Sequence, residues 1–302
     1  MHTINTARTI TRARAFAALV VLVAAACVTT LGMRPGGAAS GNTLNITAGE
    51  YVYQLKGSPK PGWVTMNFKN AGVEYHMLAI LALKPGVTTA QLKQAVLSED
   101  ENAGADVIDT SVGDEGSVSG GPTLIGPKQT TTTITELPAG HYGLLCFIPA
   151  SSDGAPHAAH GMIKVIDVKG KKSTAKPPSA GVTDVTLNDG SIDFPLTNPG
   201  RNLQLKVTNE GTTPHSFTLV KINEGKTLDD VKAYFDAAFS GQAPAGDPPG
   251  TLVGGVAAIA PGGMAYLEQT LTAGHYGYVS TEGEDPATDD YSKGMHGEFD
   301  VK

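Results

Sequence analysis

The sequence repeats one pattern twice, and this repeat limits the chain to folds that can be built from two similar units. Residues 40–168 and 182–302 carry the same motifs in the same order. The matching segments are 70–72 with 209–211, His76 with His215, 120–121 with 254–255, Pro127 with Pro261, 139–143 with 273–277, and 161–162 with 294–295. A long internal repeat of this kind indicates that each copy is one structural unit.

A polar segment separates the two copies. Residues 169–181 are rich in lysine, serine and proline and have no apolar periodicity, which is typical of a linker. Each copy is then about 120 to 130 residues long, an ordinary size for a domain with its own core. We predict a first domain over residues 40–168, a linker over 169–181 and a second domain over 182–302.

Apolar and polar residues alternate along much of each copy. Val64, Met66 and Phe68 fall on one side of an extended segment, and the second copy has the same alternation over 203–207. A period of two is typical of a strand with one buried face. Further strands are expected at 76–83, 130–137, 141–148 and 162–168, between turns rich in glycine and proline. This pattern predicts an all-β chain of two tandem Greek-key β-sandwiches.

Each copy also contains one helix signal. Thr88 with Gln91, and Thr227 with Asp230 in the second copy, have the spacing of a capping box, in which both side chains bond to the first free amides. Apolar stripes follow at Leu92, Ala95 and Val96 and at Val231, Tyr234 and Phe235. We expect each helix to pack against its sandwich through this stripe. Residues 98–121 are acidic and glycine-rich, and we expect them to form an exposed loop.

The N-terminal 39 residues resemble a targeting segment. Arg8, Arg12 and Arg14 precede the apolar run 15–33. Residues 1–39 are therefore interpreted as a signal peptide cleaved near residue 38, as a lipid anchor attached at Cys27, or as an uncleaved membrane anchor, because the run is long enough to span a bilayer. Each of these outcomes exports the chain, so we expect a periplasmic, cell-surface or secreted protein.

The charge of the exported part limits its partners. Four of the 22 basic residues lie in the targeting segment and all 29 acidic residues follow it, so the rest of the chain has a net charge of −11. Such an acidic body disfavours nucleic acid and anionic lipid as ligands, because both are polyanions. An acidic surface is instead compatible with a basic protein partner.

One loop of the first copy gathers side chains that bind soft metals. Cys146, His157, His160 and Met162 follow one another between two predicted strands, and His76 lies upstream. Cys146 is the one cysteine outside the targeting segment, so it has no intramolecular disulfide partner. A lone thiol in an oxidising compartment favours a role as a metal ligand or as a nucleophile. The alternative is a small buried apolar residue. A thiolate, two imidazoles and a thioether together are the ligand types of a mononuclear copper site.

With these motifs the chain resembles tandem cupredoxins, the blue or type 1 copper proteins related to plastocyanin and azurin. The resemblance covers nearly all of residues 40–302 and implies one copper in the first domain. It implies His76, Cys146, His157 and Met162 as ligands, with Cys146 as the thiolate, His157 as the imidazole nearer solvent and Met162 as the weak axial ligand. His160 is the competing ligand, but it lies only two residues before the methionine.

The second copy lacks most of this ligand set. Ser280 stands where Cys146 stands in the first copy, and Asp290 stands where the second imidazole would be. His215 and Met295 remain. Because a serine hydroxyl is a poor ligand for Cu(I), we expect a degenerate domain with a structural or docking role.

The resemblance implies an exported copper protein that transfers single electrons to and from a redox partner protein. Two alternatives stay open: a copper chaperone or storage protein with a copper donor or acceptor as partner, and a metal-free binding module. Two-domain copper enzymes also use tandem cupredoxin folds, but they bind extra copper with several more histidines, often as His-x-His pairs. The chain has eight histidines and no such pair, so we expect that it is not an enzyme.

Overall fold

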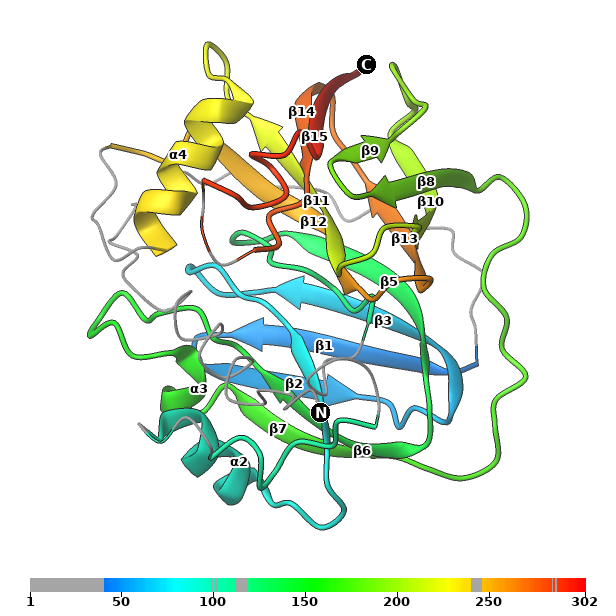
Figure 1. The fold of residues 1–302 in the computed structure, drawn as a ribbon, viewed down its shortest axis with the longest axis vertical. Coiled ribbons are helices and arrows are strands. Elements are labelled where there is room, and N and C mark those ends of the chain that lie inside the picture. Colours follow the sequence, from blue (N-terminus) through cyan, green and yellow to red (C-terminus); the bar gives the residue numbers. More distant parts are fainter. Residues whose placement is uncertain are drawn as a thin grey trace.

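A computed structural model describes residues 41–98, 100, 103–111, 119–239, 246–283, 285 and 287–302 (Figure 1). The predicted targeting segment 1–39 lies outside the described residues. In the part of the chain that is described, no helix is both long and apolar enough to cross a membrane.

The first copy is a sandwich of two sheets. Its strands are β1 (Thr43–Gly49), β2 (Val52–Lys56), β3 (Gly62–Asn70), β4 (Ala79–Leu83), β5 (Thr130–Leu137), β6 (Gly140–Leu145) and β7 (Ile163–Val168). Strands β2, β1, β3 and β5 are neighbours in one sheet, and β4, β6 and β7 form the other. Val64, Met66 and Phe68 are fully buried in the core between them, which confirms the predicted alternation.

The second copy repeats this arrangement. Its strands are β8 (Thr183–Asn188), β9 (Ser191–Asp193), β10 (Asn202–Asn209), β11 (His215–Ile222), β12 (Gly250–Ile259), β13 (Met264–Thr270), β14 (Gly274–Val279) and β15 (His296–Val301). Strands β12, β11, β14 and β15 form one sheet, and β13, β10, β8 and β9 are neighbours in the other. In both copies the first strand pairs in parallel with the third, β1 with β3 and β8 with β10. The all-β sandwich class predicted from the sequence is confirmed.

The two copies share a sheet, which the sequence did not predict. Strands β5 and β13 pair antiparallel, with Ile134 opposite Tyr266 and Thr132 opposite Glu268. This contact joins the strands into one eight-stranded sheet in the order β2-β1-β3-β5-β13-β10-β8-β9, which runs through the centre of the molecule in Figure 1. The pairing covers an edge of each half-sheet whose backbone groups would otherwise be open to solvent.

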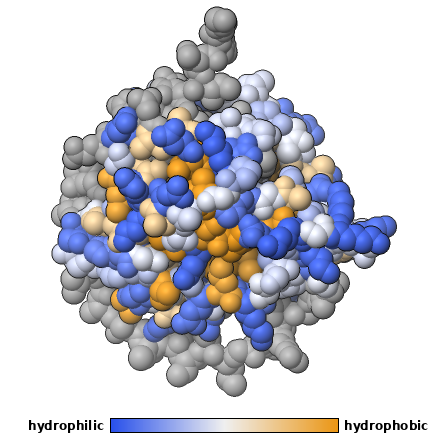
Figure 2. Space-filling view, turned by 90° about the horizontal axis from the view of Figure 1, so that it is seen from below, coloured by the Kyte–Doolittle hydropathy of each residue, from blue (hydrophilic) through white to orange (hydrophobic). Residues whose placement is uncertain are grey.

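The helices lie where the capping boxes predict them. Helix α2 (Thr89–Leu97) begins after Thr88, whose side chain and that of Gln91 form the predicted capping box. Helix α4 (Leu228–Phe239) begins after Thr227, which exchanges the corresponding bonds with Asp230. A further short helix, α3 (His157–His160), was not predicted. Figure 2 shows the face of the molecule on the side of α2, with an apolar area bordered by hydrophilic residues.

Two details differ from the sequence prediction. The expected strand over 76–83 is shorter, because His76 makes only an isolated bridge with Ile125 and β4 begins at Ala79. Residues 98–121 were expected to form an exposed loop, but Val107 and Ile108 are buried in the apolar cluster beneath α2. Part of this segment lies outside the described residues. Its described centre therefore contributes to the core, because its apolar pair closes the gap between α2 and β4.

Candidate metal centre

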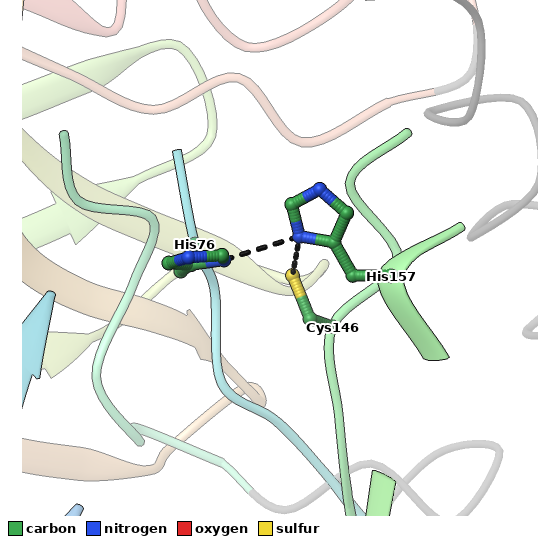
Figure 3. Close-up of side chains that lie close together, drawn as sticks. All are labelled: His76, Cys146 and His157. Carbon is green, nitrogen blue, oxygen red and sulfur yellow. Dashed lines mark hydrogen bonds between the residues drawn. The ribbon is translucent and has the colours of Figure 1, made fainter. Parts of the chain in front are cut away.

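Three of the predicted ligands meet at one end of the first sandwich. The donor atoms of His76, Cys146 and His157 all lie within 4.8 Å of one another. The His157 Nδ1 atom is 3.1 Å from His76 Nδ1 and 3.4 Å from Cys146 Sγ, and the three side chains point toward one another in Figure 3. Among the described residues, no second group of three or more His, Cys, Asp or Glu side chains is close enough to hold a metal ion.

Backbone hydrogen bonds bring these residues together from three segments. Cys146 follows the end of β6, and its carbonyl accepts a bond from the amide of Ala158 in α3. The amide of His157 donates to the carbonyl of Ile148, so the loop folds back over the cysteine. His76 is held against the neighbouring loop by its two-way backbone bonds with Ile125. Backbone hydrogen bonds therefore hold the loop over the cysteine.

Met162 lies in the same buried region. Its side chain is fully buried in the core cluster that contains Cys146. Its amide donates to the carbonyl of His157, and its carbonyl accepts from the amide of Cys146. The backbone thus ties the predicted axial ligand directly to two of the other ligands.

The environment of the thiol supports a thiolate once a cation is present. Burial raises the pKa of Cys146 to about 12, although hydrogen bonds from the backbone amides of Met77 and Ile148 to the sulfur lower it. Without a cation the thiol therefore keeps its proton at neutral pH. Donors that point at the sulfur are ready to stabilise the anion that a soft metal would bind.

The ring of His76 is arranged as a neutral donor. Burial, together with the nearby His157, lowers the pKa of His76 to about 3, so this ring is uncharged near pH 7. Its Nε2 atom is buried and has no hydrogen-bond partner among the residues that the structure describes. The two Nδ1 atoms face each other and the sulfur, which is the orientation that a metal between them would need.

Glu74 is a functional residue that the sequence analysis missed. Its Oε2 atom accepts a hydrogen bond from His157 Nε2 at 2.8 Å, and its Oε1 atom accepts one from the hydroxyl of Ser151 at 2.5 Å. Burial raises the pKa of Glu74, but the bonds from His157 and Ser151 outweigh it and lower the pKa to about 2. A carboxylate in this position fixes the tautomer that leaves the Nδ1 lone pair free for a metal. The only signal in the sequence was an acidic residue two positions before His76.

His160 does not join the cluster. Its Nε2 atom lies 3.0 Å from Asp153 Oδ1 at the surface. The structure thus brings His157, and not its competitor, next to Cys146. The resemblance implied that His157 is the imidazole nearer solvent, and the structure shows both rings fully buried. Glu74 and Tyr51 cover His157, and the reason is local: the loop of Glu74 and the β1–β2 turn both fold over α3.

The second copy has the same backbone and different chemistry. The amide of Ser280 bonds to the carbonyl of Met295, and the amide of Met295 bonds to the carbonyl of Asp290, as Cys146, Met162 and His157 do. The Asp290 Oδ2 atom lies 2.6 Å from both His215 Nδ1 and Ser280 Oγ, and His215 Nε2 bonds to Asp189 Oδ1 at 2.9 Å. A closed hydrogen-bonded group therefore occupies the position of the metal ligands.

The sandwich topology and the His–Cys–His cluster define a cupredoxin-like protein of two domains. Its ligand set is of the kind that binds copper: one sulfur and two nitrogens, all buried, with a thioether residue alongside. The chemistry of these donors fits that metal, since the Nδ1 atom of each imidazole lies within 4.8 Å of the sulfur and of the other imidazole.

Known structures include proteins of similar fold. Auracyanin B aligns with 42% of this chain and 93% of its own, at 19% identity and a TM-score of 0.30. A multicopper oxidase aligns with 86% of this chain and 88% of its own, at 15% identity and a TM-score of 0.24. The copper-containing nitrite reductase from Thermus scotoductus aligns with 86% of this chain and 61% of its own, at 13% identity and a TM-score of 0.25. No family model and no curated protein sequence matches the chain.

One expectation needs correction. The absence of His-x-His pairs led us to expect that the chain is not an enzyme, but the structures that align with most of its length include an oxidase and a reductase. The pair motif describes one arrangement of extra ligands only, so its absence cannot exclude catalysis. We withdraw the exclusion. The fold class follows from the strand topology and the ligand cluster.

Proposed function

We propose that this chain is an exported type 1 copper protein that transfers single electrons in the cell envelope. The observation that carries the proposal is the buried cluster of His76, Cys146 and His157. These residues, with Met162, would hold one copper in the domain over residues 40–168. Copper bound by such a set supplies reversible one-electron chemistry. The domain over 182–302, beyond the linker 169–181, would serve as a structural or docking partner of the first.

Three properties of the protein support electron transfer over copper delivery. All three donor residues are sealed from solvent, which opposes exchange of the metal with another protein. The ligand loop is held by backbone hydrogen bonds between Cys146, Ile148, His157 and Met162 and their neighbours. Glu74 fixes the ring of His157. A site that changes little between two metal charges lowers the reorganisation that electron transfer requires.

Export and the partner are parts of the same proposal. The basic and apolar N-terminal segment, ending near residue 39 or anchored at Cys27, supports an envelope location. The acidic body supports a basic redox partner protein and argues against nucleic acid.

Loading the protein with Cu(II) and recording its visible spectrum tests this function. We expect an intense band from charge transfer between thiolate and copper, which Cys146→Ser abolishes. The matched control is Ser280→Ala, which changes the equivalent position of the second copy and should leave the band intact. His157→Ala should bleach the band and His160→Ala should not. A wild-type protein that binds copper and stays colourless would disprove the proposal.

A further inference from the structure

A tyrosine occupies a backbone conformation that favours glycine, directly beside the proposed copper site. Tyr51 lies in the turn between β1 and β2 with φ +59°. The equivalent residue in the turn between β8 and β9 is Gly190, with φ +95°. A bulky side chain at positive φ is strained, and such strain tends to occur where function requires the side chain.

The turn itself does not need the tyrosine. A Cβ atom built on Gly161 would lie 3.4 Å from the carbonyl oxygen of Tyr51, and one built on Gly294 would lie 3.2 Å from that of Gly190. The two turns thus pack in the same way on the two equivalent loops. At the position of Gly190 the first copy adds the side chain of Tyr51, and it adds it in the copy that carries the ligand cluster.

That side chain covers the outer edge of the proposed ligand. The ring of Tyr51 meets the ring of His157 edge-on, with 4.8 Å between centroids, and lies 4.8 Å from the ring of His160. Its hydroxyl donates to Glu74 Oε1 at 3.1 Å, and Glu74 Oε2 accepts from His157 Nε2. In Figure 3 this Nε2 edge points away from His76 and Cys146. Tyr51 therefore stands between the buried imidazole and the surface.

The surroundings of Tyr51 are apolar and acidic. Tyr51 is partly exposed. Val52, the next residue along the chain, and Val73, which precedes Glu74, expose 39% and 71% of their surface. The carboxylates of Glu74 and Asp153 lie close enough to Tyr51 to raise its pKa further, in addition to burial, the main cause. An apolar contact ringed by negative charge suits a positively charged partner.

We propose that electrons pass between the copper site and a positively charged redox partner through Tyr51, in place of the exposed edge of a ligand imidazole. This inference rests on the proposed function. One electron leaves Cu(I), which becomes Cu(II), and the oxidised metal centre of the partner gains it. Tyr51 serves only as the contact, and none of its bonds or protons changes.

The test uses the full chain loaded with copper, reduced, and mixed with the cationic one-electron oxidant tris(1,10-phenanthroline)cobalt(III). We expect Tyr51→Gly, which copies Gly190, to lower the second-order rate constant at least about tenfold, equivalent to about 1.4 kcal/mol in the barrier. Tyr51→Phe, which keeps the ring, should stay within about twofold. The matched control is Lys128→Gly, because Lys128 is the other non-glycine residue at positive φ among the described residues, and its rate should not change.

Further readouts separate this contact role from a structural one. The visible spectrum of Tyr51→Gly should match that of wild type, and the copper-free variant should be no less resistant to urea than wild type. Tyr51→Asn, whose residue type tolerates positive φ, gives the same test if the glycine variant folds poorly. An unchanged rate constant for Tyr51→Gly would overturn the inference. A larger rate constant would also overturn it, since it would show that Tyr51 hinders the approach of the oxidant. If the wild type lacks the copper–thiolate band, the proposed function fails before any rate is measured.

Discussion

At the scale of single residues, the two copies give different partners to the same histidine position. In the first copy the Nδ1 atom of His76 faces another imidazole and a sulfur, and its Nε2 atom is unpartnered in the described structure. In the second copy both nitrogens of His215 bond to carboxylates. One side chain can thus serve as a metal ligand or as a hydrogen-bonded core residue, and the neighbours decide which.

Glu74 should contribute to metal affinity without touching the metal. Glu74→Gln removes the charge that orients His157, so we expect copper affinity to fall about 10- to 100-fold, as for other partners of ligating histidines. A competition titration with a copper chelator measures this. Glu50→Gln is the matched control, since Glu50 bonds to the amide of Val73 and not to a ligand. Equal affinity in Glu74→Gln and wild type would contradict the assigned role.

The buried pair of the second copy should stabilise that domain. His215 and Asp290 are almost fully buried, and Asp290→Ala leaves one side of His215 and the hydroxyl of Ser280 without their partner. We expect a loss of about 3 to 5 kcal/mol in the free energy of unfolding, measured in urea. Asp153→Ala, which breaks a surface pair with His160, should leave the free energy of unfolding nearly unchanged. Similar losses in both variants would show that burial does not matter here.

At the scale of helices and strands, local sequence patterns predicted an element reliably where the pattern satisfies a single structural requirement. The capping box at Thr88 predicted the start of α2 because few other arrangements satisfy the first amides. The period of two predicted β3 because alternate residues of that strand face the core. The start of β4 at Ala79, instead of at His76, was not predictable. His76 pairs with Ile125, which lies far along the chain, and no local pattern indicates this pairing.

A cross-strand histidine should make strand pairing in the second copy depend on pH. His275 on β14 bonds to Asp300 and Glu298 on β15, and these bonds raise its pKa. A raised pKa means that the stabilisation is complete below the ordinary histidine pKa of about 6.5 and is lost as the pH rises through the folded-state value. We expect His275→Gln to be less stable than wild type near pH 5.5 and equal to it at alkaline pH, roughly above pH 9. Urea denaturation across this range measures the difference. A constant difference at every pH would show that the charge of His275 is not involved.

At the scale of the whole molecule, the repeat predicted two similar sandwiches but not how they join. The pairing of β5 with β13 depends on two edges that no local pattern distinguishes from other edges. The same limit applies to the site. Residue types and order indicated Cys146 and His157, whereas the cover formed by Glu74 and Tyr51 depends on turns that meet only in the folded chain.

Because the two copies share a backbone, the second should regain a metal site through two changes. Ser280→Cys with Asp290→His supplies the missing sulfur and imidazole at positions whose backbone bonds to Met295 match those of the first copy. Asp189 already bonds to the Nε2 atom of His215. A carboxylate at this nitrogen fixes the tautomer of a ligating histidine, so the Nδ1 lone pair of His215 would face the new ligands. We expect the double variant to bind additional copper and to show a stronger thiolate band than wild type, measured by metal analysis and visible spectroscopy. The single variant Ser280→Cys, which keeps the carboxylate of Asp290, should not. If the double variant folds and its copper content stays at the wild-type level, the two backbones are not equivalent as scaffolds for a ligand set.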